Sequence, residues 1–350
     1  MGTVKWGILG AAKIAREQVI PAMKKSKNTE LYAIASREIS KAEDLCHKFS
    51  ITKAYDDYDK LISDPNIDAV YIPLPNHLHV PFSLNALKAG KHVLCEKPIS
   101  ITSDEIFELI EVQKETKKIV SEAFMVRFHP QWTETKKLIQ EGEIGKLNAI
   151  QGLFNYFNTD PNNIRNHVRI GGGGILDIGV YPIVTSRFIT DSEPDELISL
   201  VETDPNFETD ILASAILKFG NVQMSFTCST QSHLMQHMRF IGSKGRLELP
   251  VPFNPIADQE SEIHLWQNVN HPSQNPKVIK IEKSDQYTNQ VDQMNNAILN
   301  STTFPYSLED SLKNMKIIDS IFKSSVSKSA SGNKAKGLPP KTLSEKTSRV

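Results

Sequence analysis

The chain has 350 residues, of which 39% are hydrophobic and 23% charged, with 40 basic against 41 acidic side chains. This balance is typical of a soluble globular protein of about two domains, and it does not favour nucleic acid or an anionic membrane as a partner. No apolar run approaches the ~20 residues of a membrane span, and no leader precedes the first strand-like run, so we expect a cytoplasmic location. Cys46, Cys95 and Cys228 are too few for a disulfide framework or a cysteine-rich metal site.

The first third of the chain alternates strand-like runs with helical segments. The expected strands are VKWGILG, ELYAIAS, DAVYIPL, KHVLCE and IVSEAF, and the expected helices lie at 13–25, 40–49, 80–89 and 103–116. This alternation indicates βαβ units and a parallel sheet covered on both faces. We therefore predict an α/β fold whose first domain, residues 1–124, is a doubly wound parallel sheet.

Longer strands follow one another beyond an expected connecting helix at 130–141. They are NAIQGLFNYFN, ILASAILKFG, NVQMSFTCS, MRFIGS, RLELP, SEIHLWQ and KVIKIEK. Turn residues such as Gly220 and Asn221 separate them, so we expect successive strands to pair as antiparallel hairpins in a large open sheet. This sheet and two closing helices, at 286–300 and 307–326, make an α+β substrate-binding domain over residues 125–328.

The second closing helix carries apolar residues at helical spacing that we expect in the core, namely Leu308, Leu312, Met315, Ile318 and Phe322. Residues 329–350 are rich in Lys and Ser without periodicity. We expect them to form a loosely ordered basic tail.

The turn after the first strand fits the frame of the dinucleotide fingerprint G-x-G-x-x-G but keeps only its first glycine. The second and third positions need small side chains, for the approach of a pyrophosphate and for helix–strand packing, and alanine meets both needs. The turn lies between a strand and a helix, which favours a Rossmann dinucleotide site over a plain tight turn. The expected cofactor contacts are Gly10, Ala11, Ala12, Lys13 and Ile14.

The second expected strand ends in Ser36 and Arg37, roughly 20 residues past the glycine turn, where an NAD site carries an acid for the ribose hydroxyls. A guanidinium binds a 2′-phosphate, whereas an acid repels it. We therefore expect NADP as the preferred cofactor. The alternative is that Arg37 is a solvated loop charge and that nearby Glu38 serves NAD.

The segment IPLPNHLHVP (72–81) brings two prolines and His77-x-His79 to the carboxyl edge of the first sheet. A histidine pair suggests a metal, but no third ligand follows at a suggestive spacing, so we expect no metal site. We expect loop residues here to flank the nicotinamide riboside, namely Leu74, Pro75, Asn76 and His79.

Two further motifs bear side chains suited to chemistry. In VLCEKP (93–98), Pro98 stiffens the backbone at Lys97, although a surface lysine at a strand end is the ordinary alternative. In GGGGILDIGVYP (171–182), the glycines allow a close backbone approach, and Asp177 and Tyr181 lie four residues apart on one helix face. An ammonium near Tyr181 would lower the pKa of the phenol toward a value useful for proton transfer. A turn followed by an incidental pair is the alternative.

These motifs, in this order, resemble the glucose-fructose oxidoreductase, inositol dehydrogenase and MocA family, and within it the branch of dihydrodiol dehydrogenases and NADP-dependent sugar dehydrogenases. The resemblance covers about residues 3–326 and rests on GILGAAKIA, ASR, PLPNHLH, CEKP, FMVRFHP, NIR and GGGGILDIGVYP. It implies that Lys97 and Tyr181 form the catalytic pair, that Asp177 orients the substrate, and that Glu96 and Lys97 contact the cofactor. Many relatives have His where this chain has Tyr181, which points to the dihydrodiol and sugar-dehydrogenase branch.

The expected activity is reversible hydride transfer between a nicotinamide cofactor and a carbinol or carbonyl carbon of a sugar, polyol or dihydrodiol. Arg127, Asn158 and Arg165 are candidates for binding substrate hydroxyls, or else they tie loops together. The alternatives are a keto-sugar reductase, including one for a nucleotide-linked sugar, and a non-catalytic NADP-binding regulator. We also expect a homodimer or larger homo-oligomer, because one face of the open sheet should be partly apolar.

Overall fold

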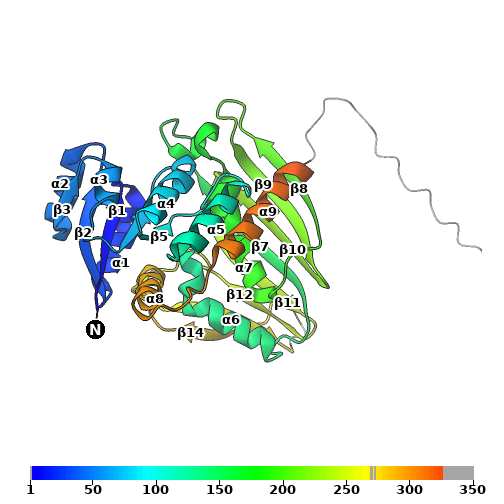
Figure 1. The fold of residues 1–350 in the computed structure, drawn as a ribbon. Coiled ribbons are helices and arrows are strands. Elements are labelled where there is room, and N and C mark those ends of the chain that lie inside the picture. The colour runs from blue at the N-terminus through cyan, green and yellow to red at the C-terminus, as the bar shows by residue number, and fades with distance from the viewer. Residues whose placement is uncertain (1, 269–270, 272, 326–350) are drawn as a thin grey trace, which may run out of the picture.

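The computed structural model describes residues 2–268, 271 and 273–325, and the expected tail at 329–350 lies outside these residues. The described chain forms a six-stranded and an eight-stranded sheet with helices packed on and between them (Figure 1). This confirms the α/β class with an α+β second half. No helix within these ranges is long and apolar enough to cross a membrane.

The first sheet has the strand order β3-β2-β1-β4-β5-β6, and all neighbouring strands are parallel. Its strands are β1 (Val4–Leu9), β2 (Thr29–Ala35), β3 (Lys53–Tyr55), β4 (Ala69–Ile72), β5 (His92–Cys95) and β6 (Val120–Glu122). The helices between them are the π-turn η1 (Ala15–Val19), α1 (Ile20–Lys25), α2 (Ile39–Phe49), α3 (Tyr58–Ile62), the 3₁₀ turn η2 (Asn76–Leu78), α4 (His79–Lys88) and α5 (Glu105–Thr116). Strand β4 is buried along its whole length, as expected of a parallel strand with helices on both faces.

The strand order reverses between β1 and β4, which are neighbours although β2 and β3 lie between them in the chain. Ligands of open α/β sheets bind beside such a reversal, outside the carboxyl ends of the strands. The turns after β1, β2, β4 and β5 all lie at this edge, and they hold the residues predicted to bind the cofactor. The sequence analysis missed β3 and α3 because they are only 3 and 5 residues long.

The second sheet has the order β14-β13-β12-β11-β7-β10-β9-β8. Its strands are β7 (Leu147–Phe157), β8 (Glu196–Thr203), β9 (Asp210–Phe219), β10 (Val222–Ser229), β11 (Gln231–Gly242), β12 (Gly245–Leu249), β13 (Ser261–Gln267) and β14 (Lys277–Ile281). The helical elements of this half are η3 (Met125–Phe128), α6 (Pro130–Gln140), η4 (Ile164–Asn166), η5 (Val168–Ile170), η6 (Ile175–Gly179), α7 (Val180–Thr190), α8 (Gln286–Asn300) and α9 (Leu308–Ser324).

The expectation that successive predicted strands pair as hairpins is correct for β9 with β10 and for β11 to β14. It is wrong around β7, because β7 does not pair with β9 and β10 does not pair with β11. Strand β7 pairs with β10 in parallel on one side and with β11 antiparallel on the other. After β7 the chain leaves the sheet, passes through α7 and re-enters at the edge strand β8. A connection of this length permits parallel pairing, which a tight hairpin does not.

Strand β8 itself was not predicted. It is the edge strand of the sheet, and its Ile198 and Leu200 are exposed on the outer face. An edge strand that is covered on one face only carries a weaker apolar signal than a central one.

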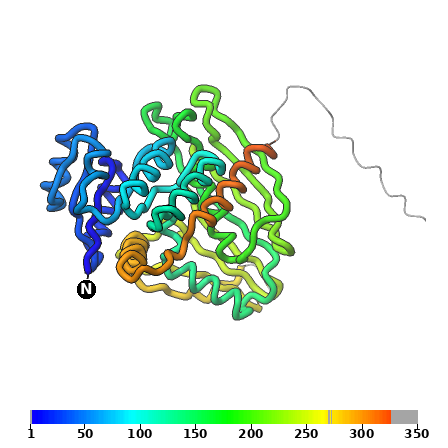
Figure 2. The backbone as a smooth tube through the Cα atoms, viewed as in Figure 1, coloured from blue at the N-terminus to red at the C-terminus, as the bar shows by residue number. Residues whose placement is uncertain are grey.

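The last two helices connect the two halves of the molecule. Helix α8 returns to the first domain and lies beside α1 and β1 (Figure 2). Trp6 Nε1 donates a hydrogen bond to Asn295 Oδ1 at 2.9 Å, and Lys25 pairs with Asp285 at 2.7 Å. Helix α9 packs against α5 of the first domain and against α7 and β8 of the second. Residues assigned to the second domain by sequence therefore help to cover the first sheet.

Helix α9 buries most of the apolar residues predicted for its core face. Leu308, Met315 and Ile318 are fully buried, and Leu312 packs against them while partly buried. Phe322, which we also predicted to be core, is 39% exposed. It lies in the last turn of the helix, where less of the neighbouring structure remains to cover it.

Candidate active site

The turn after β1 has the geometry expected of a dinucleotide turn. Gly10 has a φ of +109°, which residues with a side chain rarely adopt, and its N–H donates to the carbonyl of Ala35 on β2 at 2.8 Å. Ala11, Ala12 and Ile14 are partly buried beside it, and Lys13 is exposed. Ala15, at the third glycine position of the fingerprint, is fully buried. The two alanine positions thus meet the packing demands of the fingerprint.

The turn after β2 holds the residues predicted to select between the two nicotinamide cofactors. Ser36 is buried, and its hydroxyl oxygen accepts a hydrogen bond from the N–H of Glu38 at 3.3 Å. Arg37 is exposed and has no hydrogen bond or ion pair within the described parts of the chain. Glu38, the residue that would serve NAD, pairs with Lys41 at 2.8 Å.

The turn after β4 connects the first domain to the catalytic motifs. His79 is 1% exposed, and its two ring nitrogens lie 2.7 Å from the carbonyl oxygens of Leu74 and Pro98. Burial lowers the pKa of His79 to about 4. The ring thus lies between two backbone carbonyls, one of them that of Pro98, the residue after Lys97. The contact of His79 with the cofactor stays a prediction. Pro75, by contrast, lines an open pocket.

The described residues contain no group of three or more His, Cys, Asp and Glu side chains that could hold a metal ion. His77 is exposed, whereas both ring nitrogens of His79 lie against backbone carbonyls. The two histidines of the H-x-H pair therefore have different environments.

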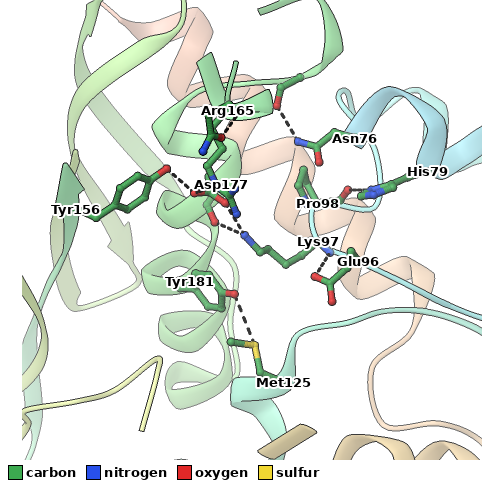
Figure 3. A network of polar contacts seen from close by, with 12 residues as sticks. Asn76, His79, Glu96, Lys97, Pro98, Met125, Tyr156, Arg165, Asp177 and Tyr181 are labelled. Atoms are coloured by element: carbon green, nitrogen blue, oxygen red, sulfur yellow. Dashed lines mark hydrogen bonds and ion pairs between the residues drawn. The ribbon is translucent and has the colours of Figure 1, made fainter. Parts of the chain in front are cut away.

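Lys97 and Asp177 meet across the domain boundary (Figure 3). The ammonium of Lys97 donates to the main-chain carbonyl of Asp177 and lies 3.0 Å from its Oδ1. Both side chains are 12% exposed. Lys97 follows β5 of the first domain, and Asp177 lies in η6 of the second. The structure thus brings together two residues that lie 80 positions apart in the chain.

The other oxygen of Asp177 accepts two hydrogen bonds, from the hydroxyl of Tyr156 and from Arg165 Nε, both at 2.7 Å (Figure 3). Burial opposes the charge on Asp177, but Arg165 and Lys97 outweigh it and hold the pKa of the carboxyl below its usual range. The carboxylate is therefore ionised and accepts from three protein donors, Lys97, Tyr156 and Arg165. It holds Lys97 in place, and its role in orienting a substrate stays a prediction.

Tyr156 was not among the residues predicted for the site. It lies at the end of β7, two residues after the buried Phe154 and therefore on the same inward face of the sheet. Alternation along this strand was a signal that could have identified it.

Tyr181 lies beside Lys97 but presents its ring, not its hydroxyl, to the ammonium. The Lys97 nitrogen is 5.1 Å from the ring centre, and the hydroxyl donates only to the thioether of Met125, at 3.6 Å. Burial among Phe154, Phe253 and other aromatic rings raises the pKa of Tyr181 far above its ordinary value. The expectation that Lys97 lowers this pKa is therefore wrong, because burial dominates.

Glu96, the neighbour of Lys97, is held by the first domain. Its Oε1 accepts a hydrogen bond from the hydroxyl of Tyr71 at 2.6 Å, and its Oε2 accepts one from the N–H of Lys97 at 3.3 Å. Burial raises the pKa of Glu96 above its usual value, against the opposing effect of the Tyr71 hydrogen bond. Glu96 fixes the backbone from which Lys97 projects.

The glycine run packs against the chain itself. Gly173 has a φ of +120°, and a Cβ there would lie 1.9 Å from Oδ1 of Asp210. The other oxygen of Asp210 accepts a hydrogen bond from the N–H of Ile175 at 2.6 Å, at the start of η6. Asp210, which carried no sequence signal, therefore positions the helix that bears Asp177 and Tyr181.

Two of the three candidate substrate residues, Arg127 and Asn158, have no hydrogen bond or ion pair with Asp177 among the described residues. The guanidinium of Arg127 lies over the rings of Phe188 and Tyr306, at 4.3 and 5.4 Å from their centres. The side chain of Asn158 accepts a hydrogen bond from the N–H of Asp160 at 3.0 Å. Both arrangements correspond to the alternative in which these side chains tie local structure together.

Two family models match this chain. Residues 4–124 match the oxidoreductase family with an NAD-binding Rossmann fold, and residues 132–248 match the GFO/IDH/MocA C-terminal domain. The chain belongs to this oxidoreductase family. The resemblance seen in the motifs is thereby confirmed, and so is the combination of a Rossmann sheet with a large, mainly antiparallel sheet.

Similar proteins with assigned names act on sugars or related compounds. A D-xylose 1-dehydrogenase (NADP(+)) 2 of Haloferax volcanii is 30% identical over 91% of this chain and 96% of its own length. The crystal structure of KijD10, a 3-ketoreductase from Actinomadura kijaniata in complex with NADP and TDP-benzene, has a TM-score of 0.86 at 28% identity and covers 93% of this chain and 98% of its own. An oxidoreductase of Rhizobium meliloti is 40% identical over 93% of this chain and 97% of its own.

Proposed function

We propose that this protein transfers a hydride reversibly between a nicotinamide cofactor, with NADP preferred, and a carbinol or carbonyl carbon of a sugar, polyol or dihydrodiol. The observation that carries the proposal is the Lys97 ammonium, which Asp177 holds at 3.0 Å and which lies 5.1 Å from the ring centre of Tyr181. This cluster stands beside the carboxyl edge of the first sheet, where dinucleotides bind in folds of this type.

The residues around the first sheet fit such a cofactor. Gly10 provides the tight turn for a pyrophosphate, and Ser36 and Arg37 stand where the ribose of the adenosine half binds. The cofactor supplies the hydride chemistry, whereas the protein supplies orientation and proton transfer. The NADP-linked names of the xylose dehydrogenase and of the 3-ketoreductase complex support this choice of cofactor.

Lys97 has one donor left for a ligand. An ammonium carries three N–H groups, and two of them go to the carbonyl and carboxylate of Asp177. The third can donate to a substrate oxygen. Lys97 would thus stabilise negative charge that develops on the substrate oxygen.

The hydroxyl of Tyr181 favours keto-sugar reduction as a second candidate function. A protonated phenol at this place can give its proton to a carbonyl oxygen during reduction. Its present acceptor, the thioether of Met125, is weak and easily replaced by a substrate oxygen. The similarity to a 3-ketoreductase supports the same direction.

The deciding experiment is an assay of aldoses, polyols, dihydrodiols and keto-sugars, including nucleotide-linked ones, with NADP(H) and NAD(H). The absorbance of the reduced nicotinamide reports hydride transfer in both directions. We expect turnover with at least one sugar-like class and a preference for NADP. Cofactor binding without turnover on any class would instead support the non-catalytic regulator.

We further propose a homodimer or larger homo-oligomer and a cytoplasmic location. The outer face of β8 and β9 exposes Ile198, Leu200, Leu212 and Ile216, which a second copy could cover. Cys46, Cys95 and Cys228 are free thiols, as expected in a reducing compartment.

A further inference from the structure

A pocket of about 650 Å³ lies between the two domains, and none of its lining residues belongs to the cluster of Lys97, Asp177 and Tyr181. The first domain contributes Arg37 after β2 and Pro75 after β4. The second domain contributes residues between 161 and 170, together with Asn206 and Phe207. The pocket therefore joins the ribose-binding edge of the Rossmann sheet to a loop of the other domain.

The side chains that line this pocket are all basic or uncharged. Arg37, His167 and Arg169 are its titratable lining residues, and no Asp or Glu lines it. Both arginines are exposed, and neither has a hydrogen bond or ion pair within the ranges that the structure describes. Two free guanidiniums at one pocket, without a carboxylate among its lining residues, favour an anionic ligand.

The segment that carries Arg169 is anchored on both sides. On one side, Arg165 donates to Asp177 at 2.7 Å. On the other, the side-chain amide of Asn76 donates to the carbonyl of Gly171 at 2.7 Å, which ties the loop to the first domain (Figure 3). Within the segment, the N–H of Gly172 donates to the carbonyl of His167 at 3.0 Å. The backbone at Arg169 is therefore held against the cofactor edge of the first domain.

We propose that Arg169 is a second cation for the 2′-phosphate of NADP and binds it from the second domain while Arg37 binds it from the first. Arg37 follows β2, which is where the 2′ position of the adenosine ribose lies in Rossmann folds. A phosphate monoester carries a charge of about −1.5 to −2 at neutral pH, so a single guanidinium does not neutralise it. This inference rests on the proposed NADP-dependent function.

The consequence is that NADP, but not NAD, bridges the two domains at the adenosine end. Arg169 then determines cofactor specificity without touching the reacting atoms. His167, in the same pocket, can add a hydrogen bond from its imidazole.

The experiment uses the full chain and two fragments that lack the nicotinamide, so that no turnover is needed. Calorimetry measures the dissociation constants of adenosine 2′,5′-bisphosphate and of 5′-AMP for the parent, R37Q, R169Q and the control K27Q. Lys27 is an exposed lysine that precedes β2, at the opposite edge of the same sheet. Arg169 is exposed, so we expect its substitution to leave the fold intact.

We expect R169Q to weaken the bisphosphate about tenfold to a hundredfold, the scale of one charge-assisted hydrogen bond, with 5′-AMP unchanged. R37Q should have an effect of the same kind, and K27Q should have none. Hydrogen exchange should show that the bisphosphate protects residues 161–170 more than 5′-AMP does.

Four outcomes would overturn the proposal, the last of them in the same titration with a nucleoside diphosphate as a third ligand. If R37Q weakens the bisphosphate and R169Q does not, Arg37 acts alone while the cofactor preference stands. If R169Q weakens both fragments equally, Arg169 does not read the 2′-phosphate. If the parent binds both fragments equally, the NADP preference of the proposed function fails as well, whereas turnover with NAD would still support an oxidoreductase. Tighter binding of a nucleoside diphosphate than of the bisphosphate would assign the pocket to a nucleotide-linked substrate.

Discussion

Asp177, in η6, connects two other segments of the second half of the chain to the turn that carries Lys97 in the first. Lys97 reaches it from the turn after β5, Tyr156 from β7 and Arg165 from η4. Because the carboxyl is ionised and shielded from water, each of these bonds is stronger than it would be at the surface. Asp177 thereby fixes the Lys97 ammonium next to Tyr181 before any substrate arrives.

Lys97 and Tyr181 should each be needed for turnover but not for binding of the cofactor. We expect Lys97→Ala and Tyr181→Phe to lower kcat by about two orders of magnitude or more, the scale of a general acid–base group. Steady-state kinetics and cofactor calorimetry on the same preparations measure the two effects. Tyr32→Phe, a partly buried tyrosine on β2, is the control. Near-normal turnover in both variants would remove the proposed pair.

At the scale of residues, sequence motifs identified the site residues that belong to short characteristic patterns. They did not identify the site residues whose role follows from tertiary packing. Lys97, Asp177 and Tyr181 lie in short patterns that mark their backbone positions, and the structure brings them together. Tyr156 and Asp210 are ordinary residues of strands β7 and β9. Their roles depend on which helix crosses the sheet, and a strand pattern does not contain that information.

At the scale of elements, the turn before η6 leaves no room for a side chain at Gly173. Gly173 has a φ of +120°, and a Cβ added at this position would lie 1.9 Å from an oxygen of Asp210. We expect Gly173→Ala to lower the free energy of unfolding by about 3 kcal/mol or more, since backbone strain and overpacking add. Urea denaturation followed by circular dichroism measures this loss.

Gly220 is the matched control for that experiment. It also has a positive φ, of +57°, but a Cβ there meets nothing within 4 Å. Gly220→Ala should therefore cost only about 1 kcal/mol, the backbone term alone. Equal losses in the two variants would show that contact with Asp210 is unimportant.

Asp210 should make stability depend on pH. Burial raises the pKa of this carboxyl from 3.8 to about 6, against the opposing effect of its backbone hydrogen bonds. The folded state thus holds a proton between pH 4 and 6 that the unfolded chain has released. This proton contributes on the order of 3 kcal/mol to the free energy of unfolding. The contribution is complete below pH 4 and is lost as the pH rises to 6.

The difference in unfolding free energy between the parent and Asp210→Asn isolates this effect. Other buried acids, such as Glu122, titrate in both proteins and cancel in the difference. We expect the parent to lose stability relative to the variant as the pH rises from 4 to 6, measured by denaturation at several pH values. Parallel stability curves for the two proteins would contradict the assignment.

Sequence patterns identified most elements because alternation and helical spacing are local properties. They did not identify the position of β7 between β10 and β11, because pairing between strands that are distant in the chain depends on the path of α7. The same limit applies to α8, whose buried Asn295 bonds to Trp6 at the other end of the chain. Local periodicity gives the helix but not the domain on which it packs.

At the scale of the whole molecule, the proposed catalytic residues depend on how the two domains meet. Lys97 belongs to the first domain, whereas Asp177 and Tyr181 belong to the second. Helices α8 and α9 hold the domains together, since each contacts both. A change in domain orientation would therefore separate Lys97 from its counterion, so the interface itself is part of the active site.

The outer face of the second sheet should form the contact between subunits. Helices α7 and α9 lie on the sheet's other face (Figure 1), and Ile198 and Ile216 are directly paired cross-strand neighbours on β8 and β9 that are 65% and 43% exposed. Exposed apolar side chains gathered on one sheet face favour association with a second, identical face. We expect the parent to be a dimer or larger by light scattering at micromolar concentration.

Charges introduced on that face should separate the subunits. In the double variant Ile198→Glu with Ile216→Glu, two carboxylates stand opposite each other on adjacent strands, where they repel, and association would also have to remove them from water. We expect this variant to be monomeric and folded, since both positions face solvent in the single chain. Ile256→Glu is the control, because Ile256 is 58% exposed but lies in a loop outside the sheet. A monomeric parent, or a double variant that keeps the parent's mass, would show that this face is not the subunit contact.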